Sequence, residues 1–147
     1  MSRKALERVE RLLDFRRKER DRAGAEVGLA MVRRERSADE ARCAERVAEG
    51  EMSDVRGSME GPVTREDLEL ALGCVLSAEE EAARKRDEEA AAENEVETTR
   101  KRLLDTHIKA RQMELLLSTV TARLQRSDRL RGQREIDDLV TTRKVRR

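Results

Sequence analysis

The sequence predicts an all-α protein: a long antiparallel two-helix coiled-coil hairpin with a C-terminal helical overhang. Three observations predict this fold. Charged residues make up 44% of the 147 residues and aromatic residues only 1%, a composition typical of long helices rather than of a globular core. Apolar side chains recur at intervals of seven near the start of the chain. Glycine and proline gather at one place near the middle. High charge is also typical of disorder, but the regular spacing of Leu, Val and Ala argues against it.

The first helix is expected over about residues 3–56. A seven-residue repeat counted from Leu6 places apolar residues at ten of sixteen core positions, with charged residues on either side. The seam is thin, because alanine often stands where leucine would pack better. The sixteen positions are Leu6, Val9, Leu13, Arg16, Arg20, Ala23, Val27, Ala30, Arg34, Ser37, Ala41, Ala44, Ala48, Glu51, Val55 and Ser58.

The only strong turn signal lies at about residues 57–63. Gly57, Gly61 and Pro62 fall within six residues there, and no other segment carries as much turn chemistry. Two helix signals follow it directly.

The second helix is expected over about residues 64–143. Thr64 is a good N-cap, and Asp67 places a carboxylate in the first turn, as in a capping box. Between residues 79 and 102 the expected seam is almost only Ala and Val, so this stretch should be stable only when paired. The expected apolar stripe is Leu68, Leu72, Val75, Leu76, Ala82, Ala83, Ala90, Val96, Leu103, Leu104, Ile108, Leu115, Leu117, Val120 and Leu124.

The short loop favours an antiparallel hairpin formed by residues 1–147 as a single unit. Folding about residue 60 pairs positions whose numbers sum to about 120. Leu13 should then lie near His107, and roughly the last 25 residues should overhang. In isolation we expect a monomeric hairpin.

The charge is strongly segregated along the chain. Residues 1–36 carry a net charge of +5, residues 37–99 of −12, and residues 100–147 of +8. In a hairpin the two basic blocks lie side by side, so both termini belong to one basic pole and the loop end is acidic. Such a field steers partners and orients them, and it gives no indication of catalysis.

Residues for catalysis or metal binding are lacking in the sequence. No glycine-rich phosphate-binding loop occurs. His107 is the only histidine, and Cys43 and Cys74 form no metal-ligand pattern, although the fold about residue 60 places these cysteines within about one helical turn of each other. We therefore expect no catalytic site, no metal and no cofactor, and not an enzyme.

The location and the non-protein partners are also constrained. No apolar run approaches the roughly 18 residues of a membrane span, and the N-terminus has no signal-peptide core, so we expect a cytoplasmic protein with no membrane insertion and two reduced cysteines. The basic C-terminus could bind nucleic acid, but it lacks stacking aromatic residues and any known fold motif. Nucleic acid binding is therefore a minor alternative, and we expect no nucleic acid partner.

Two segments resemble a known family. The basic start RVERLLDFRRKERDRA and the C-terminal QREIDDLVTTR resemble the FliJ/YscO family, the stalk proteins of flagellar and virulence type III secretion systems. The resemblance covers nearly the whole length in architecture and about 25 residues in motif. The family-like C-terminal residues are Gln133, Arg134, Glu135, Ile136, Asp137, Asp138 and Leu139.

The resemblance implies a cytoplasmic, peripheral component that couples a hexameric secretion ATPase to the ring of the export gate and can bind export chaperones. The scarcity of leucine favours the virulence-type branch. The end that carries both termini would enter the ATPase pore. A generic coiled-coil scaffold or dimerisation protein is the alternative. The basic residues expected to face an acidic pore lining are Arg3, Lys4, Arg8, Arg11, Arg126, Arg129, Arg131 and Arg134.

Overall fold

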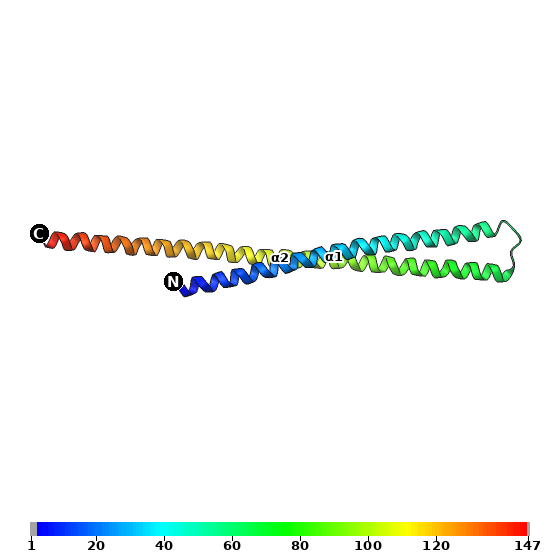
Figure 1. Ribbon diagram of the computed structural model, residues 1–147, viewed down its shortest axis with the longest axis horizontal. Coiled ribbons are helices and arrows are strands. Elements are labelled where there is room, and N and C mark those ends of the chain that lie inside the picture. The colour runs from blue at the N-terminus through cyan, green and yellow to red at the C-terminus, as the bar shows by residue number, and fades with distance from the viewer. Residues whose placement is uncertain (1–2, 147) are drawn as a thin grey trace. The chain divides into compact units, whose positions relative to one another are not determined.

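The computed structural model describes residues 3–146, and they form two helices (Figure 1). Helix α1 spans Arg3–Ser58 with 56 residues, and helix α2 spans Arg65–Val145 with 81 residues. No strand occurs among the described residues. The all-α helical hairpin expected from the sequence is confirmed. Each helix ends about two residues later than its pattern predicted.

The turn between the helices is closed by local hydrogen bonds. The Met59 N–H donates to the Val55 carbonyl at 3.2 Å, which extends the end of α1. At the start of α2 the Asp67 N–H donates to the Thr64 hydroxyl at 3.2 Å, and the Leu68 N–H donates to the Thr64 carbonyl at 3.1 Å. Thr64 is therefore the N-cap that the sequence predicted. Among the described residues the Thr64 N–H does not donate to the Asp67 carboxylate in return, so only half of a capping box is present.

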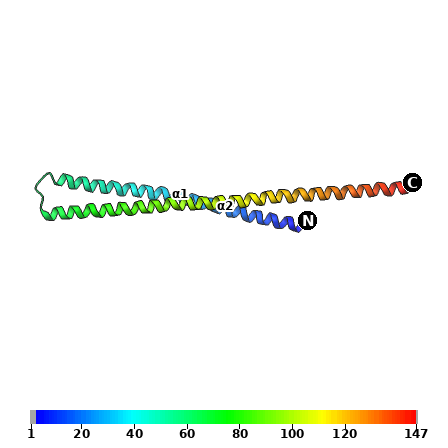
Figure 2. The same cartoon turned by 180° about the vertical axis from the view of Figure 1, so that it is seen from behind.

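The chain forms two compact units. The turn unit comprises residues 23–103. The terminal unit comprises residues 1–22 and 104–147, of which the structure describes 3–22 and 104–146. Within each unit a segment of α1 and a segment of α2 run side by side in opposite directions (Figures 1 and 2).

Burial along α1 follows the predicted seven-residue repeat. Fifteen of the sixteen core positions are buried or half-buried, and only Ser58 at the helix end is exposed. The most buried members are Leu13, Ala30 and Ala41. Small side chains fill most of the seam, so the two helices are held by a narrow band of apolar contact along the repeat.

Burial along α2 differs from the predicted stripe. The buried and half-buried positions repeat every seven residues from Leu68, and several predicted members lie on exposed faces because the seam follows the repeat and not the largest side chains. The seam positions are Leu68, Ala71, Val75, Ala78, Ala82, Lys85, Glu89, Ala92, Val96, Thr99, Leu103, Thr106, Ala110, Met113, Leu117, Val120 and Leu124. The predicted members that are exposed are Leu72, Leu76, Ala83, Ala90, Leu104, Ile108 and Leu115.

The pairing register is shifted from the expected one. Ion pairs that cross between the helices join Arg33 to Glu95 at 2.9 Å and Arg102 to Glu26 at 3.5 Å within the turn unit. Over all five such pairs, the residue numbers sum to between 125 and 131, not to 120. Opposing seam positions of the two repeats form layers that sum to 126, and Leu13 therefore faces the region of Met113 rather than that of His107. His107 is exposed.

Charge explains why the register near 120 is not used. A seven-residue repeat permits layers that sum to 119 or to 126, because a slip of one repeat keeps the same faces together. The sum of 119 would place Arg34 opposite Lys85 in the seam. In the observed register Lys85 instead donates a hydrogen bond to Glu40 at 3.3 Å. Opposite charges thus replace a like-charge layer.

The two cysteines do not lie together. In the observed register Cys43 faces the region of Lys85, which is roughly 16 Å along α2 from Cys74. Both thiols are free and exposed. The expectation that they lie within one turn is wrong, because it depended on the register that sums to 120.

Candidate protein-interaction surface

The two units carry opposite charge. The terminal unit holds 20 basic and 11 acidic side chains over residues 1–22 and 104–147, a net charge of +9. The turn unit holds 13 basic and 21 acidic side chains over residues 23–103, a net charge of −8. The near-neutral whole chain therefore consists of a cationic unit and an anionic unit.

The predicted basic partner-binding residues all lie in the terminal unit. Four come from the first turns of α1 and four from the last part of α2, and every one is exposed. None of the eight takes part in an ion pair between described residues. Their charge is therefore directed to solvent and is available to a partner. They are Arg3, Lys4, Arg8, Arg11, Arg126, Arg129, Arg131 and Arg134.

The end of α2, residues 125–146, forms a segment that we call the tail. The apolar repeat of α2 ends at Leu124, and the next positions of the same repeat are Ser127, Arg131 and Arg134. All described tail residues except Gly132 are exposed. The tail therefore has the surface of an isolated helix and lacks the seam that holds the rest of α2.

The family-like residues lie in this tail. The Thr141 and Thr142 hydroxyls donate to the Asp137 and Asp138 carbonyls at 2.8 and 2.7 Å, which adds local bonds to the backbone ladder. The side chains themselves point to solvent, and their roles in the family remain an expectation for this chain. The exposed family-like residues are Gln133, Arg134, Glu135, Ile136, Asp137, Asp138 and Leu139.

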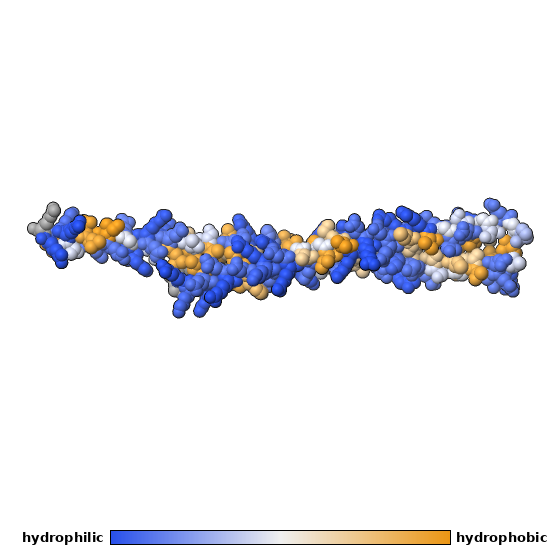
Figure 3. All heavy atoms as spheres, viewed as in Figure 1, coloured by the Kyte–Doolittle hydropathy of each residue, from blue (hydrophilic) through white to orange (hydrophobic). Residues whose placement is uncertain are grey.

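An exposed apolar face runs along the tail. Ile136, Leu139 and Val140 are 61%, 68% and 49% exposed. At about 100° per residue they share one face, with Arg129 before them and Arg143 after them on the same line. Asp137 and Asp138 lie on other faces, whereas Asp128 and Glu135 lie at the edge of this face, on the side of Leu139. Figure 3 shows the hydrophobic cluster near the C-terminal end as an orange patch among hydrophilic side chains. This face was not identified in the sequence as a separate apolar surface.

An ion-pair network in the terminal unit was also missed. Glu114 accepts hydrogen bonds from Arg111 at 3.0 Å and from Arg17 at 3.4 Å, so it joins the two helical segments. The bond from Arg111 and, after it, the bond from Arg17 hold the pKa of Glu114 below its ordinary value. The sequence carries a signal for this network: Glu114 follows the seam residue Met113, and Arg17 stands four positions after the seam residue Leu13.

Thr64 and Asp67 lie at the start of α2 and belong to the turn unit, whereas the basic residues belong to the terminal unit.

Among residues 3–146 no group of three or more His, Cys, Asp and Glu side chains is placed to hold a metal ion. Neither helix contains, within its described part, an apolar stretch long enough to cross a membrane. Comparison with known proteins found no matching family model, no similar curated protein and no similar solved structure.

Proposed function

We propose that this protein is a non-enzymatic stalk component of a type III secretion export apparatus. In this proposal it is a cytoplasmic protein, peripheral to the export apparatus, and it links a hexameric secretion ATPase to the ring of the export gate and binds export chaperones. The observation that carries the proposal is the separation of charge between the two units, together with the exposed basic tail.

The tail supports the ATPase part of the proposal. A single helix with its side chains is about 10–12 Å across, thin enough to enter the central opening of a ring of subunits. The basic residues of the tail have no ion pairs among the described residues, so an acidic lining would neutralise them without first breaking contacts of this chain. Loss of such contacts would mainly affect the rate and orientation of association.

The turn unit supports the contact with a second partner. Its net charge of −8 distinguishes it from the terminal unit, so an acidic pore lining would repel it. The contact with the gate ring and with chaperones is implied by the resemblance, and we assign it to this unit.

Binding to the secretion ATPase tests the proposal. The intact chain should retain the hexamer in a pull-down, and removal of residues 126–147 should abolish retention. The matched control changes three exposed arginines of the turn unit that have no ion pair among the described residues, Arg46, Arg56 and Arg100, to glutamine and should leave retention unchanged. Absence of binding by the intact chain, or full binding after the deletion, would contradict the stalk function.

A scaffold function is favoured by a separate observation. Leu104, Ile108 and Leu115 are exposed along one face of α2 in the terminal unit. A hairpin that opened and paired with another chain could cover such a face. Cysteines placed at Glu26 and Arg102 distinguish the two states, because a closed hairpin cross-links within one chain and an opened one cross-links between chains. Binding to nucleic acid, the minor alternative, would fall steeply with salt concentration.

A further inference from the structure

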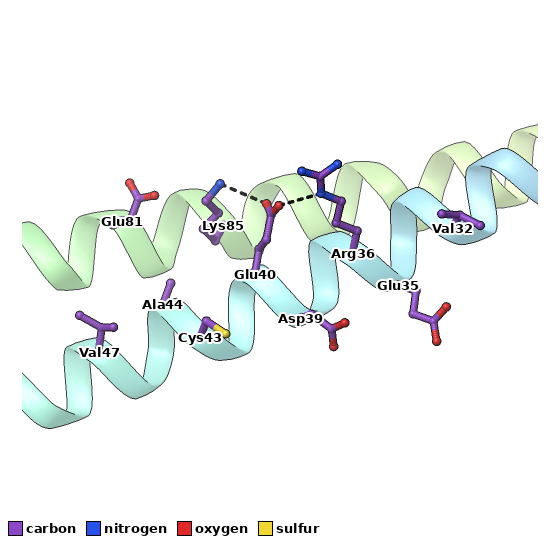
Figure 4. Close-up of a pocket in the computed structure, with 10 residues that line it drawn as sticks. All are labelled: Val32, Glu35, Arg36, Asp39, Glu40, Cys43, Ala44, Val47, Glu81 and Lys85. Atoms are coloured by element: carbon purple, nitrogen blue, oxygen red, sulfur yellow. Dashed lines mark hydrogen bonds and ion pairs between the residues drawn. The ribbon is translucent and has the colours of Figure 1, made fainter.

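A groove runs along one side of the turn unit (Figure 4). Two adjoining hollows form it, and they share Ala44, Val47 and Glu81. Its apolar side chains lie open to solvent: Val32 is 63%, Val47 57% and Leu70 72% exposed. Cys43 lines the first hollow and Cys74 lines the second. The groove thus runs along the flank of the two helices and carries apolar side chains that the hairpin itself does not cover.

Carboxylates surround this apolar strip. Six acidic residues line the two hollows against three basic ones, Arg36, Arg84 and Lys85. Glu35 and Glu51 have no ion pair among the described residues. The groove therefore suits an amphipathic helix that has apolar side chains on one face and basic side chains beside them. The acidic lining residues are Glu35, Asp39, Glu40, Glu51, Glu69 and Glu81.

The tail of this chain has that chemistry. Ile136, Leu139 and Val140 form its exposed apolar face, and Arg129 and Arg143 lie on the same face at either end. From Arg129 to Arg143 is about 21 Å along a helix. The three apolar residues themselves span about 6 Å of that helix, which fits the middle of the groove, where Ala44 and Val47 join the two hollows. The two surfaces match in the presence of exposed apolar side chains and in the opposite sign of their charge.

We propose that the tail of one copy of this chain docks as a third helix in the turn-unit groove of a second copy. The occupant is a second copy because α2 is helical without interruption from the groove to the tail, and a tail that folded back on its own groove would have to break that helix. The apolar face covers Ala44 and Val47, where the two hollows join, and Arg129 and Arg143 approach the carboxylates on either side.

The association depends on concentration and on salt. At high ionic strength or low concentration the chain remains a monomeric hairpin, because attraction between exposed charges is screened within about 3 Å at 1 M salt. This inference does not depend on the stalk function. If both hold, the second copy and the ATPase compete for the same tail.

Sedimentation equilibrium on the full chain tests the proposal with two single variants. Leu139→Asp damages the tail and Val47→Glu damages the groove, and both positions are exposed, so the hairpin should still fold. At low salt each variant should weaken self-association at least about tenfold, the effect of placing a charge in a covered apolar contact. Leu116→Asp, at an exposed position outside both surfaces, is the control and should associate as the unaltered chain does.

Mixing the two variants gives the sharpest result. The Leu139→Asp chain keeps an intact groove and the Val47→Glu chain keeps an intact tail, so the mixture should associate although neither does alone. Maleimide labelling of Cys43 should also slow on association, with circular dichroism showing unchanged helix content. A chain that stays monomeric at low salt, association that Leu139→Asp leaves unchanged, or a mixture that fails to associate would each overturn the proposal.

Discussion

At the scale of single residues, stability depends on which face of a helix a side chain occupies. Leu12 and Leu13 are neighbours in sequence, but Leu13 is 3% exposed in the seam and Leu12 is 42% exposed. Leu13→Ala should lower the free energy of unfolding by about 2–5 kcal/mol, because it leaves a cavity between the helices. Leu12→Ala should lower it by about 1 kcal/mol or less. Urea denaturation followed by circular dichroism measures both, and equal losses would contradict the seam assignment.

Acid and base should both weaken the turn unit through Glu40 and Lys85. The hydrogen bond from Lys85 is the main cause that lowers the pKa of Glu40 below its ordinary value of 4.5. The ionised Glu40 carboxylate therefore stabilises the fold above pH 4.5, and this stabilisation is lost as the pH falls through the lowered pKa. The hydrogen bond to Glu88 is the main cause that raises the pKa of Lys85 above its ordinary value of 10.5. The protonated Lys85 side chain therefore stabilises the fold below pH 10.5, and this stabilisation is lost as the pH rises through the raised pKa.

Melting temperature as a function of pH measures this effect. Glu40→Gln should flatten the acidic side of the curve, whereas Glu35→Gln, at a position without an ion pair among the described residues, should leave it unchanged. If Glu40→Gln leaves the acidic side of the melting-temperature curve unchanged, the contact between Glu40 and Lys85 does not contribute to stability.

The sequence predicted the residues of one seam better than those of the other. In α1 the repeat from Leu6 identified the buried face, because charged residues flank most of its positions. In α2 the leucines drew the prediction to Leu72, Leu104 and Ile108, which are exposed. The buried Thr99 was missed because the predicted stripe contained only apolar residues. Its hydroxyl donates to the Glu95 carbonyl at 2.9 Å, so this polar residue occupies the seam without an unpaired donor.

At the scale of the helices, the turn and cap were predictable and the register was not. Gly57, Gly61 and Pro62 located the turn, and Thr64 located the start of α2, because these signals are local. The register depends on long-range pairs such as Lys85 with Glu40, and a seven-residue repeat by itself permits more than one alignment. The candidate basic residues were likewise predicted as exposed helix, whereas the groove required knowledge of the register.

The register has a direct test in cross-linking. In a chain with Cys43 and Cys74 changed to serine, cysteines at Glu26 and Arg102 should be joined by a short bifunctional maleimide, because these side chains are 3.5 Å apart. Cysteines at Glu26 and Glu95 lie one repeat away from this pairing and should not be joined efficiently. Mass spectrometry of the digested product measures both yields, and a higher yield for the second pair would support the register that sums to 119.

At the scale of the whole molecule, composition conceals the organisation of charge. A net charge of +1 is the balance between a terminal unit of +9 and a turn unit of −8. The boundaries of these units could not be read from the sequence, but the basic and acidic blocks could. Such a charge distribution favours partners that differ in sign, and raising the salt concentration should weaken binding of an acidic partner to the tail.

The central claim is that the tail enters the ring of the secretion ATPase. Photo-cross-linking tests it most directly, with a photoreactive amino acid at Leu130 in the tail or at Leu70 in the turn unit, both exposed. We predict that the probe at Leu130 cross-links to residues lining the central opening of the hexamer and that the probe at Leu70 does not. Cross-links from Leu70 alone, or none from Leu130 in the presence of the assembled hexamer, would contradict the claim.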